Sequence, residues 1–575
     1  LRRSGHLYFG HTFTHSYPHD WRSKTPVIFR CTEQWFVGVD REMETAHLPS
    51  GRAAHRTLRT LGLACTADDV KFVPDWGRNR LRGMLEARPD WCISRQRAWG
   101  LPIPSFETLD GDTFMTAASV RAVASVVASK GSDAWFTLGP ADLLAAYDPG
   151  ADPELPPHIK AALADRAAMA TLRKGADILD VWFESGSSWH SCVKARGIAF
   201  TKPDYSDTVD LYLEGSDQHR GWFQLSLLPA LGVIGRAPYK TILTHGFIVD
   251  RDGRKLSKSR PDAAKYEVDA LAGDYGMDVM RWWVSSLAYE NDVKADLELF
   301  ALMGESYRKV RNTLRFMLSN LYDFEPEGGG EKGHAIPLTD VPPASLDAWI
   351  LSALDRVSAE VRLSYERYDF KTAHKALFDF CNNELSAEYL AAVKDRLYCD
   401  AAGSVRRRRA QTVLWTITDA LCRLLAPILP HTADEAYRAM WKAGPDDPRC
   451  IHTLEFAPST NVRWHASAAG SLAAARHAAK TALEKAKSEL GVENPLDAGL
   501  VLPDADGSLA PIDRNDLADL LGVSEVTLDP ALREPKVVDL RSRPRCERSW
   551  KRDGTVKQRS DGGMLSDRDA AAVGV

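Results

Sequence analysis

Two groups of residues near the middle of the chain have types and spacing that suit nucleotide chemistry. Glu214 and Gly215 place a carboxylate beside a residue without a side chain, where a ligand can approach the backbone closely. Lys255 and Lys258 lie three residues apart in a stretch rich in Gly, Lys and Ser. Compact ammonium groups on flexible stems can neutralise β- and γ-phosphates as charge develops in phosphoryl or nucleotidyl transfer. Singly, each group is more often a salt-bridge partner or solvated surface.

The elements around these residues predict how they meet. Residues 209–213 are a mostly apolar run that predicts a strand, 214–216 a tight turn, and Asp217 the cap of the helix that follows. Residues 239–249 predict the next strand, which leads into the lysine loop. In open α/β sheets, ligands bind outside the carboxyl ends of such strands. The pattern therefore indicates an α/β fold with both groups at one place.

The same residues resemble signatures of class I aminoacyl-tRNA synthetases. Lys255-Leu-Ser-Lys-Ser259 resembles the Lys-Met-Ser-Lys-Ser loop of that class, with Leu256 as an isosteric replacement for Met. Leu213-Glu-Gly-Ser-Asp-Gln-His-Arg-Gly-Trp-Phe223 resembles the isoleucyl version of the preceding strand and helix, where valyl and leucyl enzymes differ. Further matches, in family order, are Ser16-Tyr-Pro-His19, Arg88-Pro-Asp-Trp-Cys-Ile-Ser-Arg-Gln-Arg-Ala-Trp-Gly100, Asp177-Ile-Leu-Asp-Val-Trp-Phe-Glu-Ser-Gly-Ser187 and Ala426-Pro-Ile-Leu-Pro-His-Thr-Ala-Asp-Glu435.

The resemblance implies a reaction and a set of roles. Isoleucine would attack the α-phosphate of ATP, a substrate that brings Mg²⁺, to give isoleucyl-adenylate, and the acyl group would pass to tRNA(Ile). Lys255 and Lys258 would then stabilise the departing pyrophosphate. Implied substrate-binding residues are Glu214, Gly215, Asp217, Gln218, Trp222 and Trp182, and implied ATP-binding residues are His245, Gly246 and Lys258. Plain core packing of Trp182 and a structural role for His245 remain alternatives.

The resemblance also implies a domain order. Expected parts are 1–26 as the tail of an editing insertion, 27–104 as a return to the catalytic domain, 105–172 as a peripheral insertion, 173–290 as the second half of a Rossmann-type catalytic domain with the lysine loop, 291–345 as stem-contact helices and a linker, 346–445 as an α-helical anticodon-binding bundle, and 446–575 as a small mixed C-terminal region that contacts tRNA. The His-Ile-Gly-His signature of the class occurs nowhere in the sequence. We therefore expect a fragment that is inactive alone. A non-catalytic tRNA-binding paralogue and a valyl-type synthetase are the alternatives.

Two basic stretches are candidates for tRNA contact. Residues 302–321 predict a helix with an apolar side and a basic face that includes Arg308, Arg311 and Arg315. Ser404 is expected to cap a helix that opens with four arginines, residues 406–409. Because four consecutive residues cannot share one helix face, we expect Arg406 and Arg409 to meet phosphate and the others to face solvent. A solvated face is the alternative for both stretches.

The bulk properties describe an ordinary globular chain of several domains. Its 575 residues are 44% hydrophobic and 26% charged, with 73 Lys and Arg against 78 Asp and Glu. Any nucleic-acid surface must therefore be a local patch. The nine cysteines form no Cys-x-x-Cys pair, which favours a reducing cytoplasm, and no apolar run reaches membrane-span length. We expect a monomer.

Two sets of residues invite a metal interpretation, and neither supports it. His6, His11, His15 and His19 could align only on a helix, but residues 12–18 are rich in β-formers and end in Pro, so no helix is expected to align them. Relatives of the class often end in a zinc ribbon made from two Cys-x-x-Cys pairs. Here the four places hold Cys546, Ser549, Ser566 and Asp569. One thiolate cannot hold a structural zinc, so no zinc is expected.

Overall fold

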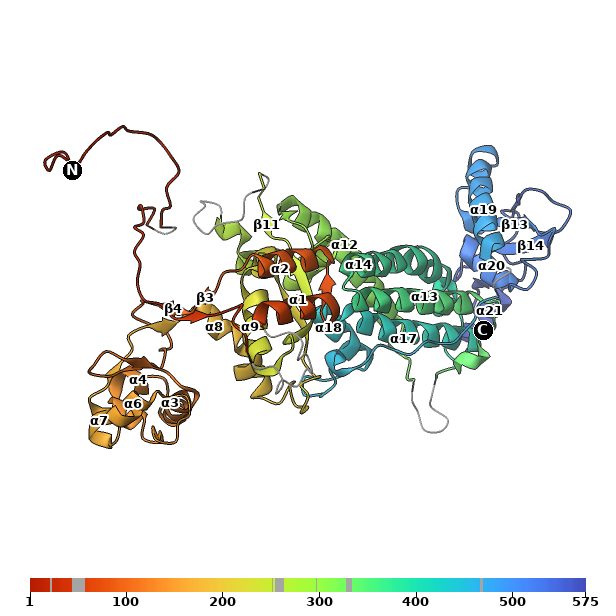
Figure 1. Ribbon diagram of the computed structural model, residues 1–575. Coiled ribbons are helices and arrows are strands. Elements are labelled where there is room, and N and C mark those ends of the chain that lie inside the picture. Colours follow the sequence, from red (N-terminus) through yellow and green to blue (C-terminus); the bar gives the residue numbers. More distant parts are fainter. Residues whose placement is uncertain are drawn as a thin grey trace. The chain divides into compact units, whose positions relative to one another are not determined.

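The computed structural model divides the chain into two compact units, residues 1–245 and 246–575 (Figure 1). It describes residues 1–20, 23–43, 57–250, 252–253, 263–295, 297–326, 334–465 and 469–575. Each unit is considered by itself.

A three-stranded parallel sheet forms the centre of the first unit. Its order is β2 (Lys71–Val73), β10 (Tyr239–His245) and β9 (Val209–Gly215). The helix α9 (Trp222–Ile234) connects β9 to β10, as a parallel pair requires. The expected strand at 209–213 is confirmed, and its neighbour begins where expected.

The expected single strand 239–249 is wrong in its extent. β10 ends at His245, and β11 (Ile248–Val249) pairs instead with β12 (Val293–Lys294) in the second unit. Gly246 lies between the two strands, and its amide donates to the carbonyl oxygen of Tyr289 at 2.8 Å. The chain leaves the first sheet at this hydrogen bond. The apolar pattern of residues 239–249 does not predict this break.

Helices cover the parallel sheet and form its core. α1 (Leu58–Asp68) begins at a capping box made by Thr57 and Thr60, and it packs with α2 (Trp76–Glu86) and α9. The core combines Leu61 and Leu81 of these helices with Phe223 and Leu231 of α9. The short helix α8 (Val181–Gly186) approaches α9 so closely that a Cβ on Gly186 would lie 2.0 Å from a backbone oxygen of Leu225.

Short strands and a small separate module complete the first unit. β1 (Phe36–Val37) pairs with β3 (Trp91–Cys92), and β4 (Ser94–Arg95) pairs with β8 (Ile178–Leu179). The module comprises β5 (Phe106–Glu107), β6 (Thr113–Phe114), α3 (Ala117–Lys130), α4 (Ala134–Thr137), α5 (Pro140–Leu143), α6 (Pro157–Ala162), α7 (Arg166–Ala170) and β7 (Arg173–Lys174). It has a hydrophobic core of its own around Phe106 and Trp135.

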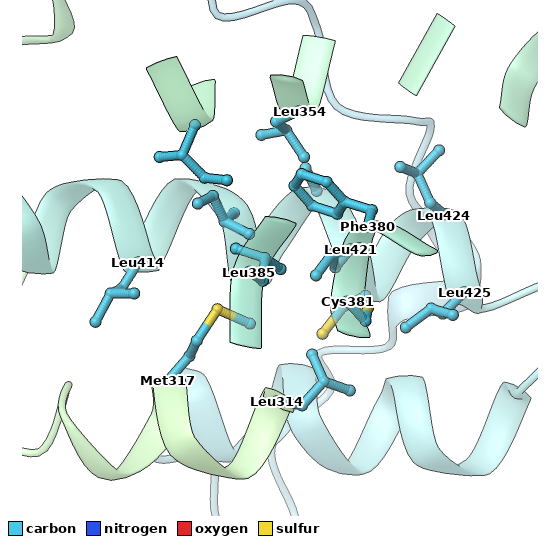
Figure 2. Packing of buried hydrophobic residues seen from close by; sticks show 14 of the residues in the cluster. Leu314, Met317, Leu354, Phe380, Cys381, Leu385, Leu414, Leu421, Leu424 and Leu425 are labelled. Carbon is cyan, nitrogen blue, oxygen red and sulfur yellow. The ribbon is translucent and has the colours of Figure 1, made fainter. Parts of the chain in front are cut away.

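The second unit is dominated by helices. They are α10 (Val268–Tyr275), α11 (Met277–Ser285), α12 (Leu297–Ser319), α13 (Leu346–Glu366), α14 (Phe370–Asp379), a π-helix (Phe380–Tyr389), α15 (Leu390–Ala392), α16 (Lys394–Cys399), α17 (Val405–Leu425) and α18 (Pro430–Met440). Figure 2 shows Leu314 and Met317 of α12 in one core with Leu414 and Leu421 of α17. Among the described residues, no helix is both long and apolar enough to cross a membrane.

A smaller mixed region follows the helices. It contains α19 (Ala469–Glu489), α20 (Arg514–Leu521) and a sheet in which β13 (Ala498–Pro503) lies between β14 (Glu525–Asp529) and β15 (Lys536–Asp539). The chain then forms β16 (Lys557–Gln558), β17 (Met564–Leu565) and α21 (Asp567–Val573).

Candidate active site

The parallel register brings the two predicted strand ends together. Glu214 is the partner of Thr244, and Gly215 is the partner of His245. Glu214 is exposed at this edge, and the amide of Gly215 donates to its carboxylate at 3.0 Å. A carboxylate, a glycine and an imidazole therefore lie at the carboxyl ends of adjacent parallel strands, where α/β sheets bind ligands.

The turn after β9 differs from the expected one. Ser216–His219 is a 3₁₀-helix, and α9 begins only at Trp222. Gln218 supplies the cap, because its side-chain oxygen accepts from the amide of Trp222 at 2.8 Å. The expectation that Asp217 caps this helix is therefore wrong, and Asp217 is exposed. The extra 3₁₀ turn moves the first orphan amides of α9 past the reach of Asp217.

Aromatic side chains form a wall beside this turn. The ring of Trp222 stacks on Tyr212 at 4.1 Å and 6°, and its indole N–H donates to the carbonyl of Ser185 at 3.0 Å. A Cβ on Gly221 would lie 2.3 Å from Gln218 and 3.4 Å from the ring of Trp182. Trp182, Gln218 and Trp222 are thus neighbours, and Trp182 keeps 37% of its surface exposed. The structure brings these three predicted residues together.

Asp180 organises the segment that carries Trp182. Its carboxylate accepts from the Trp182 amide at 3.2 Å, from the Trp91 indole at 3.0 Å and from Arg95 at 2.9 Å. The residue is buried, so these donors supply the hydrogen bonds that water would otherwise make. The sequence alone did not indicate a role for Asp180. Its position directly before a short helix was the available signal.

His219 is a second residue whose role the sequence did not indicate. Its Nδ1 lies 3.0 Å from the carbonyl oxygen of Ser216, and Nε2 lies 3.5 Å from the hydroxyl of Thr244. Burial lowers the pKa of His219 below its ordinary value, so the ring is neutral at pH 7. A carbonyl can only accept, so Nδ1 carries the proton. His219 therefore connects the 3₁₀ turn to the end of β10.

In the second unit, Gly246 has a packing reason to be glycine. A Cβ at this position would lie 2.1 Å from the backbone carbon of Asn291. The predicted lysine loop, with Lys255 and Lys258, lies outside the described residues.

The chain matches two protein-family models. The family model for class I tRNA synthetases (I, L, M and V) matches residues 18–296, and that for the anticodon-binding domain of tRNA ligase matches residues 347–502. The isoleucine–tRNA ligase of Methylacidiphilum infernorum (isolate V4) is 36% identical over 569 residues, which cover 98% of this chain and 56% of that protein. The chain is a homologue of the class I isoleucyl-tRNA synthetases.

Other relatives give the same result. The isoleucine–tRNA ligase of Kosmotoga olearia is 36% identical over 573 residues, covering 96% of this chain and 56% of that protein. The one from Desulfitobacterium hafniense is 37% identical over 584 residues, covering 97% and 57%. The chain spans a little over half the length of these relatives. The isoleucyl-type resemblance is thereby confirmed, together with a mixed α/β catalytic part and an α-helical anticodon-binding part.

In this synthetase homologue, α12 carries the first predicted tRNA face. Arg308, Arg311 and Arg315 are exposed, while Val310 and Leu314 point into the core. Arg311 also forms an ion pair with Glu435 at 3.2 Å.

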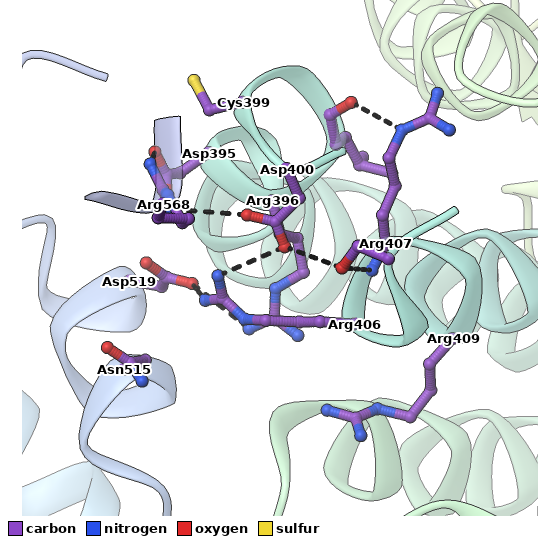
Figure 3. Close-up of polar contacts among 12 residues, drawn as sticks. Asp395, Arg396, Cys399, Asp400, Arg406, Arg407, Arg409, Asn515, Asp519 and Arg568 are labelled. Atoms are coloured by element: carbon purple, nitrogen blue, oxygen red, sulfur yellow. Dashed lines mark hydrogen bonds and ion pairs between the residues drawn. The ribbon is translucent and has the colours of Figure 1, made fainter. Parts of the chain in front are cut away.

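The four arginines at the start of α17 are arranged differently. Ser404 caps the helix as expected, since its hydroxyl accepts from the Arg407 amide. All four arginines bind carboxylates of the chain, as Figure 3 shows in part. The pairs are Arg406 with Asp519 and Asp400, Arg407 and Arg408 with Asp323, and Arg409 with Asp347. The expectation that the remaining two face solvent is wrong, because carboxylates distant in sequence reach them.

The histidine-rich start of the homologue contains no helix over residues 1–20. Within the described ranges, no group of three or more His, Cys, Asp or Glu side chains is placed to hold a metal ion.

Proposed function

We propose that this chain carries the later part of an isoleucine–tRNA ligase that activates L-isoleucine with ATP and transfers it to tRNA(Ile). The observation that supports it best is the parallel register that sets Glu214 and Gly215 beside Thr244 and His245 in a chain of this family. In this proposal strands β9 and β10 belong to the second half of a Rossmann-type catalytic domain at 173–290, β2 belongs to the segment at 27–104 that returns to the same domain, and the helices at 346–445 are the anticodon-binding bundle. Adenylation would also need the part of the relatives that lies outside the match.

The proposed amino-acid pocket uses the aromatic wall. An aliphatic side chain offers only its apolar surface for recognition, and Trp182 and Trp222 supply apolar faces next to Gln218. Asp180 would hold Trp182 in place through the amide hydrogen bond, and Tyr212 would do the same for Trp222 by stacking. Glu214, at the edge above them, would contact the charged part of the aminoacyl-adenylate, and Asp217 the same ligand from the exposed turn.

The proposed chemistry needs no covalent intermediate with the protein. The isoleucine carboxylate attacks the α-phosphorus of ATP, the bond to the β-phosphate oxygen breaks, and pyrophosphate leaves with its electron pair. His245 and Gly246 would contact the adenosine part, while Lys255 and Lys258 would compensate the charge on pyrophosphate. Mg²⁺ would enter with ATP, and no residue is assigned to hold zinc.

The proposed tRNA surface begins with α12. Its three exposed arginines follow one another at helical spacing, which suits contacts to successive phosphates. Arg406 and Arg409 stay in the proposal as secondary contacts, because a phosphate would have to compete with Asp519 and Asp347 for them.

The proposal predicts a separation between catalysis and tRNA binding. In the enzyme of full length, K258A should reduce isoleucine-dependent ATP–pyrophosphate exchange by about 10²-fold or more, because a donor to transition-state charge is lost. Its affinity for tRNA, measured by filter binding, should change by less than about twofold. The matched control is K265A, which removes an exposed lysine near the same loop and should leave both values unchanged.

Three results would contradict the proposal. Equal losses of exchange and tRNA affinity in K258A would overturn the role of the loop. Exchange that depends on valine and not isoleucine would indicate the valyl-type alternative. Absence of exchange in a full-length protein that binds tRNA would favour the non-catalytic paralogue.

A further inference from the structure

Three polar side chains near residue 575 converge on one carboxylate oxygen of a fourth residue, Asp569. Oδ2 of Asp569 accepts from the hydroxyl of Ser549 at 2.6 Å, the hydroxyl of Ser566 at 2.9 Å and the thiol of Cys546 at 3.0 Å. Cys546, Ser566 and Asp569 are buried. We call these four residues the Asp569 hub.

The hub joins two turns that are distant in sequence. Cys546 and Ser549 lie in a loop closed by the hydrogen bond from the Cys546 amide to the Lys551 carbonyl at 2.9 Å. Ser566 and Asp569 open α21, where Ser566 is the N-cap and accepts from the Asp569 amide at 3.2 Å. This capping accounts for the contact between Ser566 and Asp569. It does not account for Cys546 and Ser549, which lie 23 and 20 positions earlier in the chain.

The donor set does not fit zinc, although the two pairs have the i, i+3 spacing of a zinc ribbon. Structural zinc is held by four Cys or His ligands, whereas two of these side chains are neutral hydroxyls. The arrangement of atoms also differs from a metal site. At a metal, four lone pairs point to a common ion, but here three hydrogens point to an oxygen of the fourth residue. The carboxylate oxygen thus occupies the place that a metal would need.

The charge of the hub is compensated by two arginines. Arg568 lies 3.2 Å from Oδ1 of Asp569, and Arg548 lies 3.8 Å from the same atom. Burial works to raise the pKa of Asp569, but the hydrogen bonds from Cys546 and Ser549 and the charge of Arg568 outweigh it and lower the pKa. The carboxylate is therefore ionised at neutral pH and able to accept all three hydrogen bonds.

The same arginines connect the hub to the helical bundle. Arg568 forms ion pairs with Asp395 and with Asp400, at 3.5 Å to the latter, and Arg548 donates to the carbonyl of Tyr398 at 2.8 Å. Asp395 and Tyr398 belong to α16. Holding α21 against the 545–551 loop therefore also fixes the two side chains that reach the bundle.

We propose that the Asp569 hub closes the C-terminal module, residues 541–575, in place of a metal, and that its backbone retains a latent zinc site. The module folds without metal because the carboxylate of Asp569 accepts hydrogen bonds from the side chains at the other three positions. Replacing Ser549, Ser566 and Asp569 with Cys beside Cys546 restores four thiolates at positions that already converge. This inference does not rest on the proposed function.

The first experiment measures metal in the whole chain. The natural protein, dialysed without chelator, should contain less than about 0.1 zinc per chain and should melt at the same temperature with and without EDTA. The variant S549C/S566C/D569C should bind one more Zn²⁺ than the natural chain, and Co²⁺ should give it the visible absorption of tetrahedral thiolate coordination. The matched control adds C546S to that variant, which should abolish the absorption by removing one ligand.

Two results would overturn the proposal. One is stoichiometric zinc in the natural chain that C546S removes. The other is a folded triple variant that gains no metal site.

A second measurement covers the case in which the triple variant fails to fold. In the natural background, D569N removes an acceptor and its charge, so amide hydrogen exchange across residues 541–575 should accelerate by at least about tenfold. D567N changes a carboxylate in the same helix whose ion pairs with Lys557 and Arg559 are solvent-exposed and therefore weak, so it should have a much smaller effect than D569N. Equal exchange in the two variants would show that the hub does not hold the module.

Discussion

The two arginine-rich helices of the second unit look alike in sequence and differ in structure. On α12, Arg308, Arg311 and Arg315 are exposed, and the described structure pairs only Arg311 with a carboxylate. On α17, all four arginines bind carboxylates from other parts of the chain. A run of basic residues alone therefore does not show whether its side chains are exposed or bound to carboxylates of the same chain.

The ion pairs of the α17 arginines surround a further arginine that is fully buried. Arg396 is fully buried and bridges Asp347, Asp516 and Asp519 at 3.5, 2.6 and 3.3 Å. Arg406 and Lys551 form further ion pairs with Asp519, and Arg409 forms one with Asp347. We call these residues the Arg396 network. It joins α13, α16 and α17 of the bundle to α20 of the mixed region.

The largest effect is expected from breaking this network. R396A leaves three carboxylates without their shared buried cation, so it should reduce the free energy of unfolding of this unit by about 3–5 kcal/mol. Chemical denaturation followed by tryptophan fluorescence measures it. The matched control is R356A, which removes an exposed pair with Glu384 and should cost less than about 1 kcal/mol. Similar losses in the two variants would show that burial does not distinguish these ion pairs.

Acid provides a second and smaller test. Burial works to raise the pKa of Asp395, but the hydrogen bond from Arg568 and the charge of Lys551 outweigh it and bring the pKa to about 2. An unfolded aspartate titrates near ~3.9, so the contact stabilises the fold above about pH 4 and is lost as the pH falls towards 2. Its contribution at neutral pH is about 2–3 kcal/mol.

Comparison with D395N isolates this contribution. Burial raises the pKa of the neighbouring Asp400, so protonation of Asp400 favours the folded state, and this residue is present in both proteins. The opening free energy of α21, obtained from hydrogen exchange corrected for the intrinsic exchange rate at each pH, should fall more between pH 5 and 3 in the natural protein than in D395N, where the contact is already absent. Parallel acid profiles would assign the acid sensitivity to other groups.

The smallest effects are expected on α12. R308A and R315A should each weaken tRNA binding by about 3–10-fold and should lower the salt dependence of binding by about one phosphate contact. Neither should change stability by more than about 0.5 kcal/mol, because both side chains are exposed. R406A should have the opposite pattern. It should lower the free energy of unfolding, while the tRNA affinity of the protein that remains folded should change little. Affinity lost equally in R406A and R308A would remove the distinction between the two helices.

Local patterns predicted much of this fold. In the sequence, the apolar residues 346, 350, 353, 354, 357 and 361 follow helical spacing, and they are buried on α13. Ser404 was predicted as a helix cap from its type and place alone. The class I resemblance was carried by contiguous motifs, so a single sequence was sufficient to find it. These features depend on residues a few positions apart, where periodicity and capping decide the structure.

Features that depend on distant partners were missed. The helix cap at Gln218 follows from a 3₁₀ turn that no local pattern marks, and strand β10 stops because Gly246 packs on Asn291. The partners of Arg407 and Arg409 lie 84 and 62 positions away. Composition cannot assign such pairs, because each acid is an ordinary surface residue until the helices pack.

The Arg396 network also determines where the chain can be divided for recombinant work. The anticodon-binding family match ends at residue 502, inside β13 and before α20. An expression fragment cut there would keep Arg396 and Asp347 but lose Asp516 and Asp519. Its main buried cation would then face water or an empty surface in place of two carboxylates. A fragment that extends to residue 575 keeps these partners and also Lys551, which pairs with Asp519. The boundary that sequence similarity suggests is therefore not the boundary at which the bundle is electrostatically complete.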